Sequence, residues 1–318
     1  MGGIFYFIEP TGYNKYISAA AEGSDIAMVF RGFRNKMEER LFKWHNSWPL
    51  NKRHELPFKS FWTHKYTADV PVGTEYILMA ESFHLSYSRA FLLGLKNKFP
   101  KTHLCFVFSN PAVDYNVSKV KSLCGLYDAI ITFAKEDAQK YGFSYCDVLP
   151  MKLPAPTSSM EVRHDIFFVG KNKGRLDKIY EIYDKLHSLG LKCLFYIVGV
   201  PEEQQRHDAG LIYNTPITYE QVLTYVQQSR CVLEILQEDC HYVSIKTLEA
   251  LHYHKKLLTT NVFASESPLY DEHVIRIAHT MDDIDKEFII NEVSEEVYDS
   301  IGLVESYQPL YSYLKDLL

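Results

Sequence analysis

Short apolar runs alternate with longer amphipathic stretches along the first 150 residues of this 318-residue chain. The runs have the length of buried strands, and the stretches between them carry apolar residues at helical spacing. Strands that alternate with helices in this way are typical of parallel sheets with crossover helices. The pattern predicts strands at residues 4–8, 26–30, 76–80, 104–108 and 129–133, and helices at 86–98, 117–123 and 135–141, the last closed by Gly142.

The alternation stops at residues 149–159, which read LPMKLPAPTSS and contain three prolines before a polar end. Such segments are typical of linkers. The alternation then begins again, with strands predicted at 165–169, 193–198, 231–236, 256–260 and 274–278 and helices at 176–189, 219–228 and 245–253. Gly190 is expected to close the first of these helices, and Thr218 to cap the second with Gln221 three residues on. The tail, 293–318, is expected to be mostly helical, with breaks near Gly302 and Pro309.

Two successive α/β halves joined by a linker predict two Rossmann-like, doubly wound domains that face a cleft. The N-terminal domain is expected at residues 1–153 and the C-terminal domain at 154–318, with the last helix packing back on the N-terminal domain. In open α/β sheets, ligands bind beyond the carboxyl ends of the strands. Functional residues are therefore expected directly after the predicted strands.

The formal net charge is −6, which argues against general nucleic-acid binding. The charge is unevenly spread along the chain. Residues 1–157 contain 19 Lys and Arg against 14 Asp and Glu, whereas residues 158–318 contain 15 against 26. This asymmetry supports two separate folding units and suggests that the N-terminal half meets an anionic partner.

The six cysteines show no CxxC spacing, and several lie inside apolar runs. Buried free thiols in a reducing compartment are the expected outcome. No signal-peptide pattern is visible, and no apolar run approaches the roughly 20 residues needed to span a bilayer. We therefore expect a cytoplasmic protein, or one that is peripheral at the inner face of a membrane.

A basic, glycine-containing segment, VGKNKGR at residues 169–175, follows one predicted strand and opens the next helix. Glycines let backbone amides approach a phosphate, and the start of a helix favours an anion. Beside Gly170, the cations Lys171, Lys173 and Arg175 would bind phosphate oxygens. The segment matches neither a Walker A loop nor the GxGxxG pattern, so an ordinary basic turn is the alternative.

Residues 231–261, CVLEILQEDCHYVSIKTLEALHYHKKLLTTN, predict a strand, a loop, a helix that begins near Ser244 and a second strand. This segment resembles the donor-binding segment of GT-B glycosyltransferases. It is most similar to glycosyltransferase-like proteins of bacterial surface-polysaccharide gene clusters, through EILQ at 234–237, SIK at 244–246, EA at 249–250 and KKLLTTN at 255–261. VGKNKGR and spaced residues between 127 and 142 extend the resemblance over about the last two thirds of the chain.

The resemblance implies a nucleotide-sugar site in the C-terminal half. It implies that Glu249 binds the ribose hydroxyls and that Ser244 and Lys246 face the diphosphate, with Gln237 and His241 completing the donor site. His241 stands where many retaining members have a second carboxylate, and Lys246 stands where an arginine is expected. From the residues alone, Glu249 would instead be a solvated helix charge and Gln237 the cap of a strand end.

A catalytic base is expected from the N-terminal domain, because sugar transfer needs a base near the acceptor hydroxyl. Glu81 and His84 follow the predicted strand at 76–80 and would lie at its carboxyl edge. Either residue would serve as the base of an inverting mechanism. The alternative is that Glu81 caps the following helix and His84 packs on it.

Residues 31–65 contain nine Lys and Arg against three Asp and Glu, together with all three tryptophans of the chain. Basic residues with tryptophan suit a peripheral contact with an anionic membrane surface, or an acceptor groove that stacks sugars. The alternative is a surface helix that buries its tryptophans against the sheet.

These features favour a metal-independent glycosyltransferase that moves a sugar from a nucleotide-sugar co-substrate to a glycan or lipid-linked acceptor in surface polysaccharide biosynthesis. A sugar-nucleotide epimerase and a non-catalytic nucleotide- or glycan-binding subunit are the alternatives. No cofactor and no metal site are expected. His252 and His254 diverge on their helix, and the acidic run at 282–285 is expected to open a helix instead of binding a metal.

Overall fold

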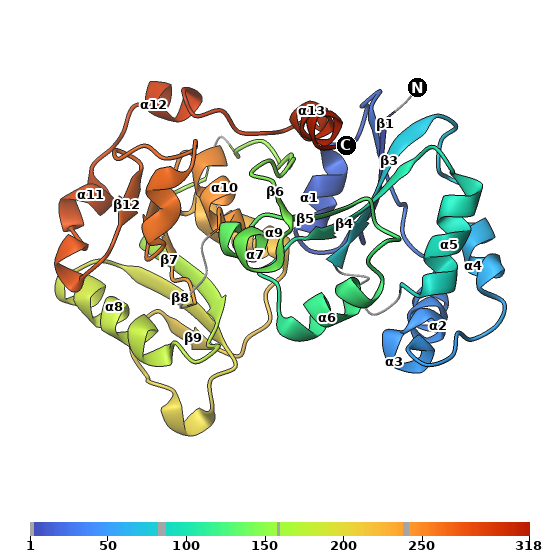
Figure 1. Ribbon diagram of the computed structural model, residues 1–318. Helices are drawn as coiled ribbons and strands as arrows, with labels where there is room; N and C mark the ends of the chain where they lie inside the picture. Colours follow the sequence, from blue (N-terminus) through green and yellow to red (C-terminus); the bar gives the residue numbers. More distant parts are fainter. Residues whose placement is uncertain (1–2, 82–86, 158–159, 238–241) are drawn as a thin grey trace. The chain divides into compact units, whose positions relative to one another are not determined.

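The computed structural model describes residues 3–81, 87–157, 160–237 and 242–318, and the chain forms two compact units. One unit consists of Met1–Lys152 together with Val304–Leu318, and the other consists of Leu153–Leu303. Each unit is built on a six-stranded parallel sheet (Figure 1). The prediction of an α/β chain with two doubly wound sheets is therefore confirmed.

The strands of the first sheet lie in the order β2-β1-β3-β4-β5-β6, and each neighbouring pair is parallel. The chain places β2 on one side of β1 and β3 on the other, so the direction of winding changes between β1 and β3. The strands are β1 Gly3–Phe7, β2 Ala27–Val29, β3 Thr74–Ala80, β4 His103–Phe108, β5 Ala129–Thr132 and β6 Ser144–Tyr145.

Helices cover both faces of this sheet. Ile77 belongs to the core that the sheet shares with α2, α4, α5 and α6. Its neighbour Tyr76 points to the opposite face, where its ring lies edge-on to that of Tyr311 in α13, and Tyr307 donates a hydrogen bond to the carbonyl of Ile17 in α1 (3.1 Å). The helices are α1 Asn14–Ala19, α2 Lys36–Asn46, α3 Trp48–Asn51, α4 Lys59–Tyr66, α5 Arg89–Lys98, α6 Asp114–Ser122, α7 Lys135–Tyr141 and α13 Gln308–Leu317.

The second sheet has the order β12-β11-β10-β7-β8-β9, again with parallel neighbours. The chain winds outward from β7 through β8 to β9 and then returns to place β10 on the other side of β7. The winding direction therefore changes between β7 and β10. The strands are β7 His164–Lys171, β8 Cys193–Val198, β9 Leu211–Tyr213, β10 Ser229–Glu234, β11 Lys256–Thr259 and β12 Ile275–Ile277.

The alternation of side chains along β7 divides the second core between two layers of helices. Phe168 packs with residues of α8 and α11, whereas Phe167 faces the other way and its ring meets that of Tyr225 in α9 at 5.5 Å. Thr218 and Gln221 form a complete capping box at the start of α9, as predicted. The helices are α8 Leu176–Ser188, α9 Tyr219–Gln227, α10 Ile245–His252, α11 Lys286–Ile290 and α12 Glu295–Asp299.

Some elements differ from those predicted. The predicted helix break at Pro309 is wrong, because Pro309 lies in the first turn of α13, where its missing N–H needs no partner. The helix predicted from residue 86 begins at Arg89, and Ser88 caps it. Cys124 is exposed, whereas the other four cysteines of the described segments are buried, and all five are free. None of the helices in these segments has both the length and the apolar content needed to cross a membrane.

Candidate functional site

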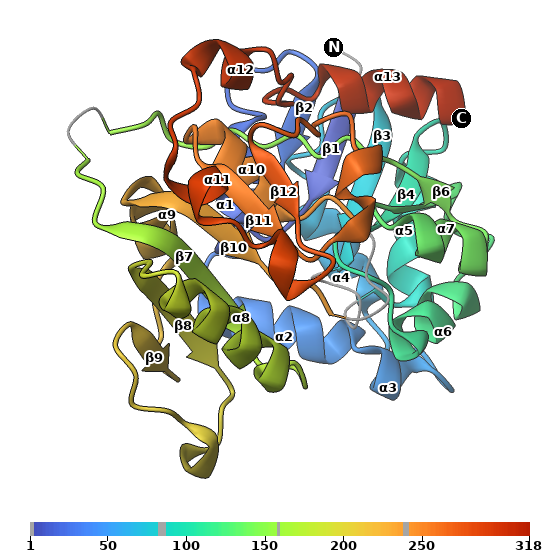
Figure 2. The same cartoon turned by 90° about the vertical axis from the view of Figure 1, so that its left-hand side faces the viewer.

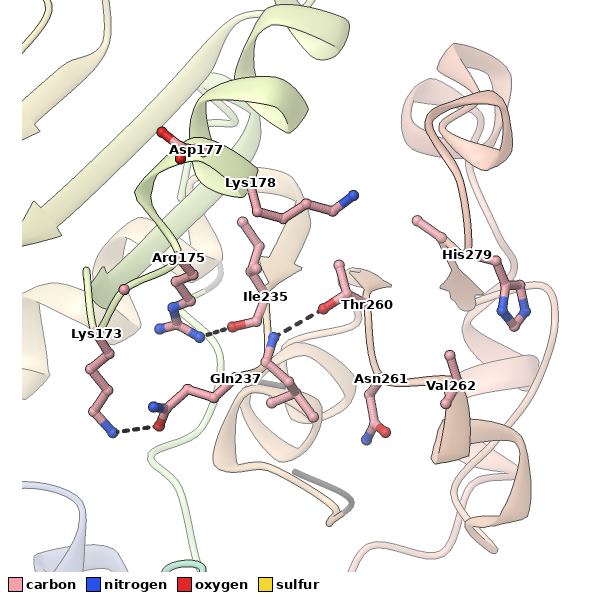
Figure 3. Close-up of a pocket in the computed structure, with 13 residues that line it drawn as sticks. Lys173, Arg175, Asp177, Lys178, Ile235, Gln237, Thr260, Asn261, Val262 and His279 are labelled. Carbon is pink, nitrogen blue, oxygen red and sulfur yellow. Dashed lines mark hydrogen bonds between the residues drawn. The ribbon is translucent and has the colours of Figure 1, made fainter. Parts of the chain in front are cut away.

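A cavity of about 770 Å³ lies at the carboxyl ends of β7, β10, β11 and β12 (Figure 3). Four loops form its walls, and each of them follows one of these strands. The cavity includes the point between β7 and β10 where the winding direction changes, which is where ligands bind in open α/β sheets. Its lining consists of Lys173, Gly174, Arg175, Asp177, Lys178, Ile235, Leu236, Gln237, Thr260, Asn261, Val262, Ala278 and His279.

Two cationic side chains connect the loop after β7 to the loop after β10. Lys173 Nζ donates to Gln237 Oε1 at 3.0 Å. The Arg175 guanidinium donates to the carbonyl oxygen of Ile235 (Figure 3). Its Nη2 also donates to the carbonyl oxygen of Lys171 at 3.1 Å. Arg175 therefore joins the ends of β7 and β10 across the point where the winding direction changes.

The backbone between β7 and α8 explains how these cations reach the cavity. Lys173 and Gly174 both have positive φ angles, 47° and 79°, so the chain turns sharply before α8 begins. Glycine adopts this conformation without strain. At Gly170, an added Cβ would lie 3.0 Å from Arg175 Nη2, so the absence of a side chain there leaves room for the guanidinium.

The cavity has the electrostatic character of an anion site. Lys173, Arg175 and Lys178 line it together with the single carboxylate of Asp177. The first turn of α8 also borders it, and no side chain of the described residues caps this helix start. The first amides of a helix lack intrahelical partners, and the helix dipole favours negative charge at this end. The wall beside α8 is therefore suited to a phosphate group.

The opposite wall is polar and held by hydrogen bonds. Thr260 Oγ1 accepts from the backbone N–H of Leu236 at 3.0 Å, which joins the loops after β10 and β11. Asn261 is buried, and its Nδ2 donates to the carbonyl oxygen of Tyr242 (3.0 Å) while its Oδ1 accepts from the backbone N–H of Phe263 (3.1 Å). These bonds hold the loops in place around the cavity.

Glu249 lies in α10 and is fully buried. Its carboxylate accepts from the Tyr219 hydroxyl at 2.6 Å and from Lys246 Nζ at 3.1 Å. Ser244 caps the start of the same helix by accepting from the backbone N–H of Lys246 (3.0 Å). The alternative that Glu249 is a solvated helix charge is therefore wrong, and its role toward a ribose stays a prediction.

Glu234, at the end of β10, is a second buried carboxylate. Thr259 donates to its Oε2 at 2.5 Å. Burial raises the pKa of Glu234, and hydrogen bonds from Ser244 and Thr259 oppose that rise. The first residue of the EILQ segment thus lies in the interior, where it connects β10 to β11.

Glu81, at the end of β3 in the first unit, is buried, and its carboxylate accepts hydrogen bonds from Asn110 and Asn116. Asn110 donates from its backbone N–H (3.2 Å) and from Nδ2 (3.3 Å), and Asn116 Nδ2 donates at 3.1 Å. Burial raises the pKa of Glu81, and these hydrogen bonds oppose the rise. The alternative that Glu81 caps the following helix is wrong, because Ser88 is the cap of α5.

The acidic run near residue 282 has a local role. The Asp283 carboxylate accepts from the backbone N–H of Thr280 (2.7 Å), and Asp285 caps α11 by accepting from that of Glu287 (2.9 Å). The prediction that this run opens a helix is confirmed. Within the described segments, no three His, Cys, Asp or Glu side chains gather closely enough to hold a metal ion.

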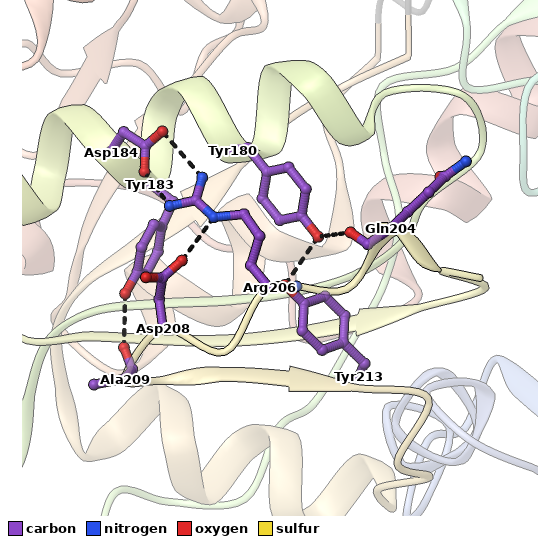
Figure 4. A network of polar contacts seen from close by, with 8 residues as sticks. All are labelled: Tyr180, Tyr183, Asp184, Gln204, Arg206, Asp208, Ala209 and Tyr213. Atoms are coloured by element: carbon purple, nitrogen blue, oxygen red, sulfur yellow. Dashed lines mark hydrogen bonds and ion pairs between the residues drawn. The ribbon is translucent and has the colours of Figure 1, made fainter. Parts of the chain in front are cut away.

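A polar network holds the loop between β8 and β9 against α8 (Figure 4). Arg206, in this loop, forms two hydrogen bonds to Asp184 of α8 (2.7 and 3.0 Å) and one to Asp208 (2.6 Å). Its guanidinium also stacks 4.9 Å from the centre of the Tyr180 ring. The Arg206 hydrogen bond lowers the pKa of Asp184.

Replacing Arg206 with methionine is expected to loosen this loop and to change global stability by no more than about 1 kcal/mol, because the ion pairs are substantially exposed. Hydrogen exchange measured by mass spectrometry should be faster in the variant than in the wild type, and this increase should be confined to the loop between β8 and β9. Because the folded-state pKa of Asp184 is lowered, the pair stabilises the fold above the unfolded-state pKa. This contribution is lost as the pH falls through the folded-state pKa. Arg163→Met serves as the control, and equal exchange in both variants would count against the network.

No protein-family model matches the sequence, and no curated protein matches it significantly. Solved structures do match. AviGT4, a glycosyltransferase involved in avilamycin A biosynthesis, gives a TM-score of 0.61 at 11% identity, over 99% of this chain and 96% of its own. HepE from Anabaena, solved with UDP and glucose, gives 0.52 at 9% identity over 98% and 95%. TarM gives 0.55 at 9% identity over 81% of this chain, which spans only 57% of TarM.

The chain has the GT-B fold. The fold predicted from the resemblance is thereby confirmed.

Within this GT-B chain, the structure brings only part of the predicted donor set together. Lys173, Arg175 and Gln237 line the cavity. Gly170 and Lys171 lie beside it in β7, where the carbonyl of Lys171 accepts from Arg175 and Gly170 leaves space for the guanidinium. Ser244, Lys246 and Glu249 lie at the start of α10 or within it and are not among the lining residues. His84 and His241 lie outside the described residues.

Several lining residues are not among those predicted, although most follow predicted strands. Thr260 and Asn261 end the KKLLTTN segment, and His279 comes directly after the strand predicted at 274–278. The position after a strand is the signal that would have identified them. Asp177 and Lys178 lie in the first turn of α8 and have no such signal.

Proposed function

We propose that this protein is a glycosyltransferase that binds its nucleotide-sugar donor in the cavity of the second unit. The observation that carries the proposal is the cationic wall of Lys173, Arg175 and the start of α8 at the winding change between β7 and β10. A diphosphate is the part of such a donor that this wall fits. HepE, solved with UDP and glucose, supports the choice of ligand through its shared fold.

In the proposed reaction, an acceptor hydroxyl oxygen forms a bond to the anomeric carbon of the sugar while the bond from that carbon to the diphosphate breaks. Arg175, Lys173 and the amides of the first turn of α8 would stabilise the charge that develops on the leaving diphosphate. Glu81 would take the proton of the acceptor hydroxyl. The protein's own cations serve the leaving group here, so activity without added metal is expected.

Glu249 would bind the ribose hydroxyls, as the resemblance implies. Its carboxylate is fully buried and accepts from Tyr219 and Lys246, so a ribose can reach it only if one of these side chains moves. His241, in place of the second carboxylate of many retaining members, favours one second candidate, a nucleotide-binding subunit that does not transfer sugar. The resemblance alone carries the narrower proposal that the acceptor is a glycan or lipid-linked molecule of surface polysaccharide biosynthesis. A cytoplasmic location is proposed from the cysteine pattern of the sequence.

Thermal unfolding with UDP, GDP, CMP and TDP tests the donor site. One of these nucleotides is expected to raise the Tm, because a ligand that binds only the folded state stabilises it. Lys173→Gln should weaken binding of that nucleotide about tenfold by removing a charge-assisted contact. Lys192→Gln, an exposed position outside the cavity, is the matched control. If no nucleotide shifts the Tm at millimolar concentration, the proposed donor site is wrong.

Turnover separates the candidates once a nucleotide binds. A transferase releases the nucleotide from the matching sugar nucleotide faster when an acceptor is present. An epimerase changes the sugar without an acceptor, which NMR detects. A binding subunit does neither, so nucleotide binding with no reaction would favour the second candidate.

A further inference from the structure

Helix α2 of the first unit carries an exposed apolar stripe. Met37, Leu41 and Trp44 are 71%, 47% and 61% exposed. Their spacing of four and three residues places them on one face of the helix. Water-exposed apolar side chains gathered in this way mark interaction surfaces more often than isolated ones do.

The other face of α2 is satisfied within its own unit. Phe42 is buried, and its ring meets those of Trp62 and Tyr66 in α4 at 5.5 and 5.0 Å. Lys65 of α4 forms an ion pair with Glu38. One side of α2 therefore packs on the core, and the apolar stripe on the other side is left uncovered. Helix α2 is labelled in Figure 2.

Cations accompany the apolar stripe. Lys36 and Arg40 are exposed, and helical geometry places Arg40 next to Trp44, one turn away. The neighbouring elements add further exposed apolar residues, Leu50 in α3 and Phe58 and Phe61 at α4. Residues 31–65 have an excess of six positive charges in a chain whose net charge is −6. The basic character is thus local to this segment.

We propose that the exposed face of α2, formed by Lys36, Met37, Arg40, Leu41 and Trp44, docks on an anionic lipid bilayer. A helix with apolar side chains beside Lys and Arg lies in the plane of the interface, with its apolar residues in the headgroup and acyl boundary and its cations among the phosphates. Tryptophan favours the same boundary. The side chains that α2 exposes are therefore those that an interfacial helix requires.

Charge argues against a second copy of the chain as the occupant. A two-fold contact through this face would place the basic segments of two molecules against each other, and like charges oppose such a contact. An anionic bilayer instead complements the segment and repels the rest of the acidic molecule. Binding should therefore be sensitive to salt.

Sedimentation with vesicles of phosphatidylcholine, with and without phosphatidylglycerol, tests the proposal on the full chain. Partition is expected only with the anionic vesicles, with a blue shift of tryptophan fluorescence. Each cation near an anionic surface contributes roughly fivefold to partition. Lys36→Glu with Arg40→Glu should therefore weaken it at least about tenfold, and Leu41→Ser with Trp44→Ser should do the same.

The control is Val72→Ser with Lys101→Glu, an apolar residue that is 95% exposed and a cation outside the basic segment. All variants should keep the wild-type Tm, which shows that they fold. The proposal is overturned if anionic vesicles fail to bind the protein, or if the control loses binding as strongly as the α2 variants. Concentration-dependent self-association that the α2 variants abolish would also overturn it in favour of a second copy. None of these readouts depends on the donor site.

Discussion

Replacing Arg175 with methionine is expected to weaken nucleotide binding by about 10- to 100-fold. The change removes a guanidinium that would contact the diphosphate, and charge-assisted hydrogen bonds contribute roughly 1.5–3 kcal/mol each. It also removes the connection between the carbonyl oxygens of Lys171 and Ile235, so the loops after β7 and β10 lose their relative position. Isothermal titration calorimetry of the folded protein measures the Kd directly.

Two further variants separate charge, geometry and stability. Arg175→Lys keeps the positive charge but loses the fork that spans two carbonyl groups, so an intermediate Kd is expected. Arg163→Met removes an exposed arginine outside the cavity and should bind nucleotide like the wild type. If Arg175→Met keeps the wild-type Kd while only its Tm falls, Arg175 is a structural brace and the diphosphate lies elsewhere.

The sequence predicted the strands well because both sheets are parallel and buried on both faces, which produces continuous apolar runs. It missed the edge strands β6 and β9, which are only two and three residues long. The edge strands β2 and β12 are equally short but lie within longer, mostly apolar runs, at 26–30 and 274–278, whereas the run at β9 is only three residues long, between Gly210 and Asn214. The caps at Thr218 and Gly142 were predictable because capping depends on residues close in sequence.

The site was harder to predict because it depends on the order of the strands. Lys173 meets Gln237, 64 residues away, only because β10 returns to lie beside β7. The hydrogen-bond partner of the buried Glu249 is Tyr219, which belongs to a different helix, and no local pattern in α10 reveals that partner. Positions after strands were therefore predictable, whereas contacts between those positions required the topology.

Replacing Glu81 with glutamine is expected to lower turnover by about 10²- to 10⁴-fold, the usual contribution of a general base, with little change in nucleotide affinity. Glutamine keeps the size of the side chain and cannot accept a proton from the acceptor. Burial raises the pKa of Glu81, which makes its carboxylate a stronger base than an exposed glutamate. Initial rates of sugar transfer, with donor and acceptor varied in turn, give the separate effects on kcat and KM.

The pH profile distinguishes a base from a structural carboxylate. Only ionised Glu81 can act as the base, so the rate should fall as the pH drops through its raised pKa. Asn116→Ala removes a hydrogen bond that lowers this pKa, and should move the acid limb to higher pH. Because the folded-state pKa is raised, ionisation of Glu81 costs stability as the pH rises through that pKa, and Glu81→Gln removes this cost. If Glu81 only holds Asn110 and Asn116 in place, Glu81→Gln should lower the Tm. In that case Asn116→Ala should leave the acid limb of the pH–rate profile where it is in the wild type.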